Sequence, residues 1–560
     1  MLTKQAIVET LIDCGAKTAF TLPGLGITWT LDEFHKRRKD IRVVLTRSEQ
    51  IASVMAQVTG RLTGRPGLFM GQGPFASTTG AFGILEAHFA GSPMVVLTET
   101  SDYDGFGQYG VYQTMTGDYG GADIKQMLGS ITKYCTYATE PQDAVYGIQM
   151  AFKHASLPRK GPAAVILKTP IIRREMPQAP RARLFPAAGY FTHTPARPDA
   201  AAVARLGEML AGAKFPVILA GNGVAAAESG AKLAQLADLC GAAVATSYNA
   251  KGVVPETMPW SVGMLGTWGM ASANRALEEA DCVIVLGASL GPDYLRFRDA
   301  KLIRPGEQKL AQVDVDPRNS AWVYPMDHAV QGDCGDVLDM LLARKYDAAA
   351  TRTRLERIAG IQKATGYWNV AKHAAAPGSV SLSDIVQSLD RFLAPEDMLT
   401  LDAGSNRIWA TSQLKIRTPG QLVVPGGIGG MGWGAPAAAA AKLVHPGRRI
   451  TCLAGDGGFM MTMPVLTTCV QHDLPIVVVV ANNHGLGMVR DNLKATPIAV
   501  EFADVDFARI AEGLGCKGMR VDAPGQLDDA IAEAHRSGAP CVIDVKVDPE
   551  ASHMQVSHYG

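Results

Sequence analysis

The stretch that decides the fold reads ITCLAGDGG at 450–458, FMMTMPVLTTCVQH at 459–472 and IVVVVANN at 476–483. The first and last segments contain apolar runs of strand length, and the middle segment has the length of one helix. A strand, a helix and a second strand in this order form a crossover unit whose two strands are parallel. The sequence therefore predicts that Asp456 and Asn483 lie at the same edge of one sheet, the carboxyl edge where open α/β sheets bind ligands.

The residue types at these two strand ends suit a magnesium ion. A carboxylate from Asp456, an amide oxygen from Asn483 and backbone carbonyls next to glycine are hard oxygen ligands of the kind that Mg²⁺ takes. The glycines around Asp456 let the backbone approach a diphosphate closely. Either half alone is more typical of a tight turn or a loop. The two halves together, each after a strand, favour a metal and diphosphate site.

The bulk composition places the chain among folded globular proteins. With 560 residues it suggests about three domains, and its formal net charge of zero gives no sign of a nucleic-acid or anionic-membrane partner. The nine cysteines are scattered and form no Cys-x-x-Cys pair, so neither a disulfide framework nor a zinc site is expected. No apolar run approaches the roughly 20 residues of a membrane helix, and the N-terminus does not resemble a signal peptide. These features predict a cytoplasmic protein.

Three stretches of the chain alternate short apolar strands with helical patterns. This alternation predicts an α/β protein with three doubly wound parallel-sheet domains, at about residues 1–172, 199–345 and 380–548. A basic, proline-rich linker joins the first two domains. In the middle stretch, Gly221-x-Gly223 follows a strand. It fits a tight strand-to-helix turn better than a complete dinucleotide fingerprint, and nucleotide binding there stays open.

Two further segments carry candidate functional residues. Glu49 follows the apolar run 41–46 and opens a helix, where Thr46-x-x-Glu49 also reads as a capping box. The glycine-rich segment 426–436 contains Met431 and lies between a strand and a helix. So many glycines beside a bulky side chain suit close backbone approach to a ligand, although a buried methionine in a flexible loop is the simpler alternative.

Together these segments resemble the signature of thiamine diphosphate (ThDP) enzymes. The similarity is to the branch that contains acetohydroxyacid synthase, pyruvate oxidase and sulfoacetaldehyde acetyltransferase, and it extends over essentially the whole chain. The similarity also includes the segments 20–24, 63–67, Gly73-Pro74 and 263–266. The resemblance implies a pyrimidine-binding domain, a central Rossmann-like domain and a diphosphate-binding domain, in that order, with ThDP and Mg²⁺ as cofactors.

The resemblance also implies roles for individual residues. Glu49 would protonate the aminopyrimidine of the cofactor, and Gln113 would border the active site. Asp456, Asn483 and the Gly485 carbonyl would hold the metal, while Met431 and the Gly429 carbonyl would shape the bent cofactor. The further cofactor-binding residues that it implies are Pro23, Gly24, Ser405, Asn406, Gly457, Gly458, Leu486 and Met488.

The implied reaction is that of an acetolactate synthase-like carboligase. The enzyme would form an enamine from a 2-oxo acid or aldehyde and transfer the two-carbon unit to an acceptor. The alternatives are a non-ligating 2-oxo acid decarboxylase, a sulfoacetaldehyde acetyltransferase-like lyase and an FAD-dependent pyruvate oxidase. In this family Glu49 and Asp456 of one site come from different subunits, which implies a homodimer at least and predicts a homotetramer.

Several departures from the family pattern bear on the substrate. Asn492 stands where acetohydroxyacid synthases have a tryptophan, and Phe75 replaces a glycine and should narrow the pocket. The arginine of the flavin-binding members is missing from 286–290, which argues against FAD. The segment 99–109 is long and glycine-rich, and it either lines the pocket or forms a mobile loop.

Overall fold

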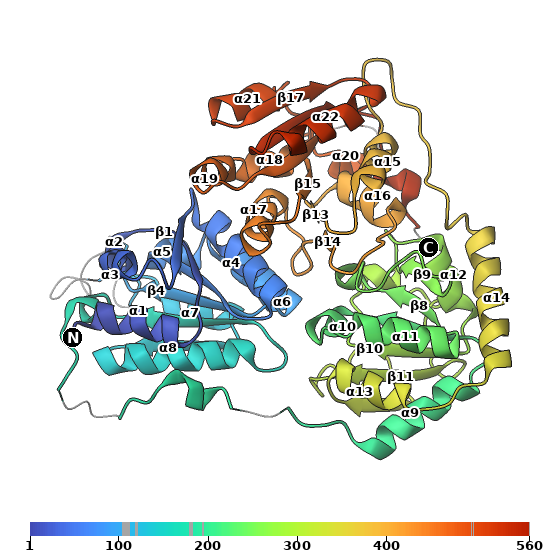
Figure 1. The fold of residues 1–560 in the computed structure, drawn as a ribbon, viewed down its shortest axis with the longest axis horizontal. Helices are drawn as coiled ribbons and strands as arrows, with labels where there is room; N and C mark the ends of the chain where they lie inside the picture. Colours follow the sequence, from blue (N-terminus) through green and yellow to red (C-terminus); the bar gives the residue numbers. More distant parts are fainter. Residues whose placement is uncertain are drawn as a thin grey trace.

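A computed structural model describes residues 1–558 except 103–112, 118–120, 179–182, 193–194, 494–495 and 497. Within these residues the chain forms three sheets, each of six parallel strands, with helices packed around them (Figure 1). The predicted α/β class with three doubly wound sheets is confirmed. We refer to the domains built on β1–β6, β7–β12 and β13–β18 as the N-terminal, central and C-terminal domains.

The sheet of the N-terminal domain has the strand order β2-β1-β3-β4-β6-β5. Its strands are β1 (Thr18–Leu22), β2 (Arg42–Leu45), β3 (Gly67–Gly71), β4 (Met94–Glu99), β5 (Tyr134–Ala138) and β6 (Pro162–Leu167). The helices around it are α1 (Thr3–Asp13), α2 (Leu25–Thr28), α3 (Leu31–Lys36), α4 (Glu49–Thr63), α5 (Gly73–Ser77), α6 (Ala81–Ala90), α7 (Ile124–Ile131) and α8 (Pro141–Ser156). The 3₁₀ turns η1 (Thr169–Arg173) and η2 (Ala187–Tyr190) follow.

The central sheet has the order β12-β11-β10-β7-β8-β9. Its strands are β7 (Pro216–Ala220), β8 (Ala243–Thr246), β9 (Ser261–Met264), β10 (Cys282–Leu286), β11 (Lys309–Asp314) and β12 (His328–Gln331). Its helices are α9 (Ala200–Gly212), α10 (Asn222–Ala226), α11 (Gly230–Cys240), α12 (Ala271–Glu279), α13 (Cys334–Leu342) and α14 (Ala348–Ala364), with 3₁₀ turns η3 (Tyr248–Ala250) and η4 (Asp293–Leu295).

The C-terminal sheet has the order β14-β13-β15-β16-β18-β17. Its strands are β13 (Met398–Leu401), β14 (Leu422–Val423), β15 (Ile450–Gly455), β16 (Ile476–Asn482), β17 (Lys517–Val521) and β18 (Cys541–Lys546). Its helices are α15 (Leu382–Phe392), α16 (Ser405–Gln413), α17 (Gly434–Val444), α18 (Asp456–Thr462), α19 (Val465–Gln471), α20 (Gly487–Leu493), α21 (Phe507–Gly513) and α22 (Pro524–Arg536), followed by η5 (His553–Val556).

The segment between β15 and β16 differs from the prediction of one helix over 459–472. It forms two short helices, α18 and α19, which are separated at Met463 and Pro464. Proline has no backbone N–H to donate to the preceding turn, and its ring clashes with that turn, so the helix is interrupted there. The crossover itself is as predicted, because β15 and β16 pair in parallel.

The N-terminal and C-terminal domains share one hydrophobic core. Helix α4 packs on α17, whose small residues 437–441 are fully buried, and the core runs from the N-terminal sheet through these helices to the C-terminal sheet. In Figure 1 the two helices lie between the two domains. Within this core the Trp433 indole donates to the Gln57 amide oxygen over 3.0 Å. This packing fixes the helix that begins at Glu49 against the domain that carries Asp456.

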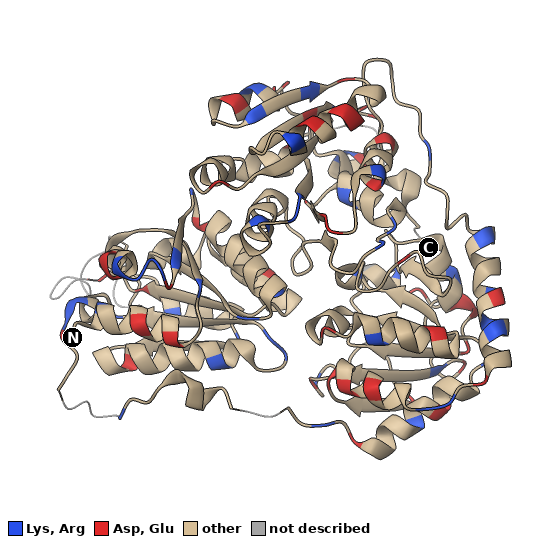
Figure 2. Cartoon of the chain, in the orientation of Figure 1, with Lys and Arg blue, Asp and Glu red and all other residues tan. Residues whose placement is uncertain are grey.

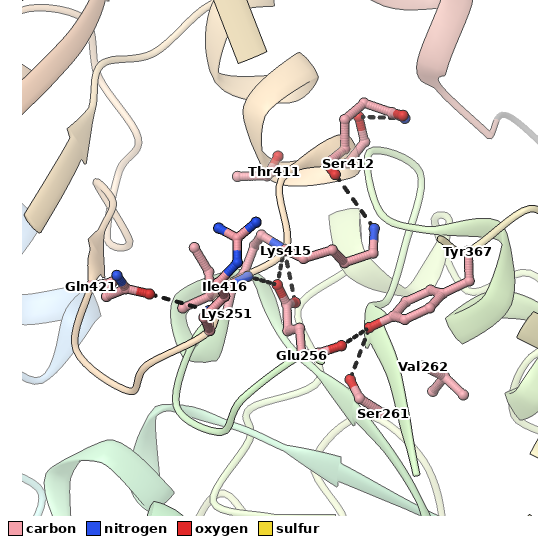
Figure 3. Close-up of polar contacts among 12 residues, drawn as sticks. Lys251, Glu256, Ser261, Val262, Tyr367, Thr411, Ser412, Lys415, Ile416 and Gln421 are labelled. Carbon is pink, nitrogen blue, oxygen red and sulfur yellow. Dashed lines mark hydrogen bonds and ion pairs between the residues drawn. The ribbon is translucent and has the colours of Figure 1, made fainter. Parts of the chain in front are cut away.

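A buried polar cluster joins the central and C-terminal domains (Figure 3). Lys251 Nζ lies 2.8 and 2.6 Å from the two carboxylate oxygens of Glu256, and both side chains are fully buried. Glu256 also accepts a hydrogen bond of 2.9 Å from the backbone nitrogen of Ile416. Beside them, Lys415 lies over the ring of Tyr367, and burial lowers the pKa of Lys415 to about 8.

The charge distribution agrees with the zero net charge. Basic and acidic residues are interspersed in all three domains (Figure 2). In the part of the chain that the structure describes, no helix is both long enough and apolar enough to cross a membrane.

Candidate functional site

The predicted metal residues meet at the carboxyl edge of the C-terminal sheet. Gly455 of β15 pairs with Ala481 of β16, so Asp456 and Asn482 leave the sheet side by side. Asp456 is the first residue of α18 and is buried, with one carboxylate oxygen accepting from the Gly457 backbone nitrogen over 2.8 Å. Its other oxygen accepts from the Gly485 backbone nitrogen over 2.9 Å. Burial raises the pKa of Asp456 above its ordinary value.

Asn483 and Gly485 present their polar atoms at the same place. One terminal atom of the Asn483 amide lies 2.9 Å from the Gly485 carbonyl oxygen, and the other lies 3.3 Å from Arg490 Nη2. With the amide oxygen toward Arg490, the nitrogen donates to Gly485. With the oxygen toward Gly485, two acceptors face each other. Two neighbouring ligands of an octahedral Mg²⁺ at about 2.1 Å stand about 3.0 Å apart, so this donor set fits the ion.

The start of α16 supplies groups suited to a diphosphate. Ser405 opens this helix after Gly404, whose φ of 118° is accessible to glycine. The Ser405 hydroxyl is buried and has no hydrogen-bond partner in the described residues. A Cβ on Gly487 would lie 3.6 Å from this hydroxyl and 2.6 Å from Asn483 Nδ2, so only glycine leaves space between them. An unpartnered buried hydroxyl at the positive end of a helix fits an anionic ligand.

Asn406 and Asp402 connect the start of α16 to the neighbouring segments by hydrogen bonds. The Asn406 amide donates to the Asp402 and Leu453 carbonyl oxygens over 3.3 and 3.4 Å. The fully buried Asp402 carboxylate accepts from the backbone nitrogens of Gly432 and Gly434, at 2.9 and 3.0 Å. Burial raises the pKa of Asp402 to about 6. Asp402 thus ties the start of α16 to the glycine-rich loop, a role that the sequence did not reveal.

The glycine-rich loop before α17 carries Gly429 and Met431. Gly429 has a φ of 63°, and a Cβ on it would lie 3.3 Å from Arg407 Nη1. A second anchor comes from the N-terminal domain, because the fully buried Glu86 of α6 accepts from the backbone nitrogens of Ile428 and Gly429 over 2.9 and 3.3 Å. Sequence reasoning missed Glu86, since nothing local to α6 indicates a partner more than 300 residues away.

The remaining predicted residues of this half lie on the same edge. Gly457 and Gly458 form the first turn of α18, and a Cβ on Gly457 would lie 3.0 Å from the Leu486 side chain. Leu486 donates its backbone N–H to the Val500 carbonyl over 2.7 Å, and Met488 belongs to the first turn of α20.

The predicted residues of the N-terminal domain gather at the carboxyl edge of their own sheet. Pro23 and Gly24 follow β1, and the buried Glu49 begins α4 after β2. Ser48, rather than Thr46, is the N-cap of α4, because its hydroxyl accepts from the Ile51 backbone nitrogen over 3.2 Å. The capping box predicted from Thr46 is therefore wrong. Glu49 accepts a hydrogen bond of 3.3 Å from the Thr79 hydroxyl.

Gln113 lies at this edge as well, with a positive φ of 57°. Its amide oxygen accepts a 2.7 Å hydrogen bond from Gln72, the N-cap residue of α5. Val111 and Tyr112, which precede Gln113, and most of the segment 99–109 lie outside the described residues. Phe75 is on α5 and is 39% exposed.

The predicted site thus consists of two groups at two sheet edges. Ser405, Asn406, Asp456 and Asn483 belong to the C-terminal group, and Glu49 belongs to the N-terminal group. In the described part of the chain, no hydrogen bond joins Glu49 or Gln113 to the C-terminal group. Clusters of three or more His, Cys, Asp or Glu side chains suited to a metal are also absent from the described residues.

Comparison with protein families accounts for this arrangement. Residues 1–121 match the N-terminal TPP binding domain of thiamine pyrophosphate enzymes, residues 203–341 the central domain, and residues 402–545 the C-terminal TPP binding domain. The chain belongs to the thiamine pyrophosphate enzyme family. The predicted order of pyrimidine, central and diphosphate domains agrees with these three matches.

Curated members of the thiamine pyrophosphate enzyme family match over nearly the full chain. A probable acetolactate synthase large subunit of Methanocaldococcus jannaschii is 28% identical over 557 residues, which cover 97% of this chain and 92% of the relative. The acetolactate synthase of Mycobacterium bovis is 28% identical over 561 residues, 98% of this chain and 88% of the relative. A putative thiamine pyrophosphate-containing protein of Bacillus subtilis is 26% identical over 555 residues, 98% and 92% of the two chains.

A cavity of about 720 Å³ lies where the central domain of this thiamine pyrophosphate enzyme meets the other two domains. Asn222, Ala288 and Asp314, which line it, lie at the carboxyl ends of β7, β10 and β11 or just after them. The loop 425–429 and Arg407 close it from the C-terminal domain. Doubly wound sheets bind nucleotides at this edge, and the volume is typical of a ligand site.

Proposed function

We propose that the protein is a ThDP- and Mg²⁺-dependent enzyme that cleaves the bond next to a 2-oxo acid or aldehyde carbonyl and transfers a two-carbon unit to an acceptor. The observation that carries the proposal is the placement of Asp456, Asn483 and Gly485 around one point, beside the unpartnered Ser405 hydroxyl. The similarity to relatives named acetolactate synthase supports the carboligase reaction over the decarboxylase, acetyltransferase-like and oxidase reactions.

In this proposal the chain binds the cofactor through its C-terminal edge. Asp456, Asn483 and the Gly485 carbonyl would hold Mg²⁺ on the diphosphate, and Ser405 and Asn406 would bind the diphosphate oxygens. Gly429 and Met431 would support the two rings. When bound, ThDP supplies a nucleophilic carbon and an electron sink for breaking the C–C bond.

Glu49 would hold the proton that activates the cofactor ring, and Gln113 would border the substrate. Glu49 is buried and accepts a hydrogen bond from one side-chain hydroxyl, that of Thr79. A buried carboxyl that can give and take a proton suits general acid–base work.

We propose a homodimer as the least assembly, with a tetramer built from two such dimers. Within one chain, Glu49 and Asp456 belong to groups at separate sheet edges, so a second copy would complete each site. Apolar side chains near these edges support this, since Met461 beside Gly432 is 51% exposed and Phe75 is 39% exposed. Size-exclusion chromatography with light scattering measures the assembly, and a monomer with full turnover would contradict it.

Product NMR on the protein with ThDP, Mg²⁺ and pyruvate, with and without a second 2-oxo acid, tests the reaction. Acetolactate or a mixed ligation product is the expected result. Acetaldehyde alone would indicate a non-ligating decarboxylase. If pyruvate is not consumed, a sulfonated aldehyde with phosphate as acceptor tests the acetyltransferase-like alternative.

The cavity in the central domain favours one second candidate, an FAD-dependent oxidase of pyruvate. Its position at the carboxyl edge of β7 and β10 is where such a domain would hold a dinucleotide. A yellow purified protein with flavin absorbance and pyruvate-dependent bleaching would support this candidate. A colourless protein that forms acetolactate at full rate would exclude it.

A further inference from the structure

A buried carboxyl group is connected to Gln113 through the hydrogen bonds of Ser101 and Gln72. Glu99 is the last residue of β4 and is fully buried. Its two oxygens accept from the backbone nitrogens of Gly73 and Ser101, and one also accepts from the Thr169 hydroxyl over 2.6 Å. Backbone nitrogens can only donate, so both oxygens act as acceptors. These donors hold Glu99 in one orientation.

Burial raises the pKa of Glu99 above its ordinary value. In its ionised form Glu99 can only accept, so the hydroxyls next to it act as donors to it. The Thr169 oxygen already accepts from the Asp102 backbone nitrogen over 3.2 Å, which leaves its proton for Glu99. The Ser101 hydroxyl donates to Glu99 over 3.2 Å and accepts from the Gln72 amide over 3.3 Å. The group of Gln72 that faces Ser101 is therefore its NH₂.

The orientation of the Gln72 amide determines that of the Gln113 amide. The same Gln72 nitrogen donates to the Gln113 amide oxygen over 2.7 Å. The position of Gln72 is tight, because a Cβ on Gly24 would lie 2.2 Å from its amide oxygen. With its oxygen bonded to Gln72, the Gln113 amide presents N–H donors on its other side. Gln113 is partly exposed and has a left-handed backbone conformation.

We propose that Glu99, Ser101 and Gln72 are positioning residues that fix the Gln113 amide with its N–H groups toward the substrate. The substrate group recognised there is then a hydrogen-bond acceptor, namely an oxygen of a carboxylate or of a sulfonate. This inference rests on the proposed function, in which Gln113 borders the substrate. It adds the chemistry of the recognised group and the residues that select it.

Two variants disrupt this series of hydrogen bonds at different points. Glu99→Gln replaces an ionised carboxylate, which can only accept, with an amide of the same shape, so the hydrogen bonds of Ser101 and Gln72 can reverse. Gln72→Glu places a second carboxylate against the Gln113 oxygen and forces that amide to turn. We expect each variant to raise the KM for the donor substrate about ten-fold or more and to change kcat less than about three-fold. The dissociation constant for ThDP should not change.

Thr169→Val is the matched control. It removes a donor to the other oxygen of Glu99, with similar damage to a buried network, but among the described residues it makes no hydrogen bond to Ser101, Gln72 or Gln113. We expect it to lower the melting temperature and leave KM unchanged. Equal KM effects of Thr169→Val and Glu99→Gln would overturn the proposal in favour of a purely structural network.

To distinguish a carboxylate from a sulfonate as the recognised group, KM is measured for a 2-oxo acid and for a sulfonated aldehyde with every variant. The donor whose KM responds carries the recognised group. A wild-type protein that neither binds ThDP nor consumes a donor overturns the proposed function, and with it this inference. Wild-type turnover with unchanged KM in both Glu99→Gln and Gln72→Glu overturns the positioning proposal alone.

Discussion

The Asp456 carboxylate accepts a 2.9 Å hydrogen bond from the backbone nitrogen of Gly485, which follows a different strand 29 residues later. The bond ties the turn after β15 to the turn after β16. It also orients the segment after β16, which carries Asn483 and Gly485, before any ion binds. In the proposed site, Asp456 thus has two tasks, as a ligand and as the support of another ligand.

Asp456→Asn tests both tasks. The amide keeps the size of the side chain but removes the charge and one acceptor, so Mg²⁺-dependent ThDP binding should weaken at least 100-fold. Isothermal titration with ThDP, with Mg²⁺ and with EDTA, measures this. Asp473→Asn is the control, because Asp473 has a positive φ that asparagine tolerates and precedes the opposite end of β16. If both variants bind equally, the metal assignment is wrong.

Glu49→Gln should keep ThDP binding and lose turnover by about 100-fold or more, the usual range for loss of a general acid–base group. Steady-state kinetics at saturating ThDP and Mg²⁺ give the result. Ser48→Ala provides the control, since it removes the N-cap bond of the same helix and should cost about 1 kcal/mol of unfolding free energy without that loss of turnover. Turnover of Glu49→Gln at the wild-type rate would leave Glu49 a helix-start residue and no more.

The sequence anticipated the elements whose signal is local. Continuous apolar runs such as 476–481 predict strands buried on both faces, and β16 is buried along its whole length. The spacing of two such runs was enough to bring Asp456 and Asn483 to one edge. The break at Met463-Pro464 also has a local signal, because a proline interrupts a helix.

Contacts between distant segments were not predictable in this way. Glu86 binds the backbone of a loop more than 300 residues later, and Asp402 binds two glycines 30 and 32 residues later. Neither residue lies in a local pattern that shows its partner. The prediction of Thr46 as the N-cap failed for a related reason, since Ser48 also has a hydroxyl and only the backbone path decides which hydroxyl faces the first turn of the helix.

Ser405→Ala should affect the free and bound protein in opposite directions. The Ser405 hydroxyl is buried and has no hydrogen-bond partner among the described residues, so its removal should leave the unfolding free energy of the apoprotein unchanged or slightly higher. If the hydroxyl binds the diphosphate, the dissociation constant for ThDP should rise about five- to ten-fold. Thermal melts with and without ThDP and Mg²⁺ report both effects. A loss of apoprotein stability with unchanged ThDP affinity would make Ser405 a structural residue.

Glu256→Gln should destabilise the protein by about 3 to 5 kcal/mol, because it leaves the fully buried Lys251 without its carboxylate. Urea unfolding measures the change, and Lys251→Met combined with Glu256→Gln should recover part of it. Asp339→Asn, which breaks the exposed pair with Lys232, should change stability by less than about 1 kcal/mol. Equal effects of the buried and exposed variants would contradict the role of the cluster between the central and C-terminal domains.

His535 predicts a loss of stability in mild acid. Burial lowers its pKa from 6.5 to about 4, and its ring contacts the Thr451 hydroxyl of β15 at 3.0 Å. Between these two pH values the unfolded chain binds more protons than the folded one, so the unfolding free energy falls as the pH falls from 6.5 to 4. The expected loss is about 1 to 2 kcal/mol, less than the full linkage value because the ring is partly exposed.

The difference between the wild type and His535→Gln isolates this contribution. Asp402, whose pKa is raised to about 6, acts in the opposite sense, because its folded form binds more protons than its unfolded form below that pH. Its effect is the same in both proteins and cancels in the difference. Urea unfolding at pH 7, 6, 5 and 4.5 should therefore show that the unfolding free energy of the wild type falls relative to that of the variant as the pH falls. Parallel curves over this range would mean that His535 titrates alike in the folded and unfolded states.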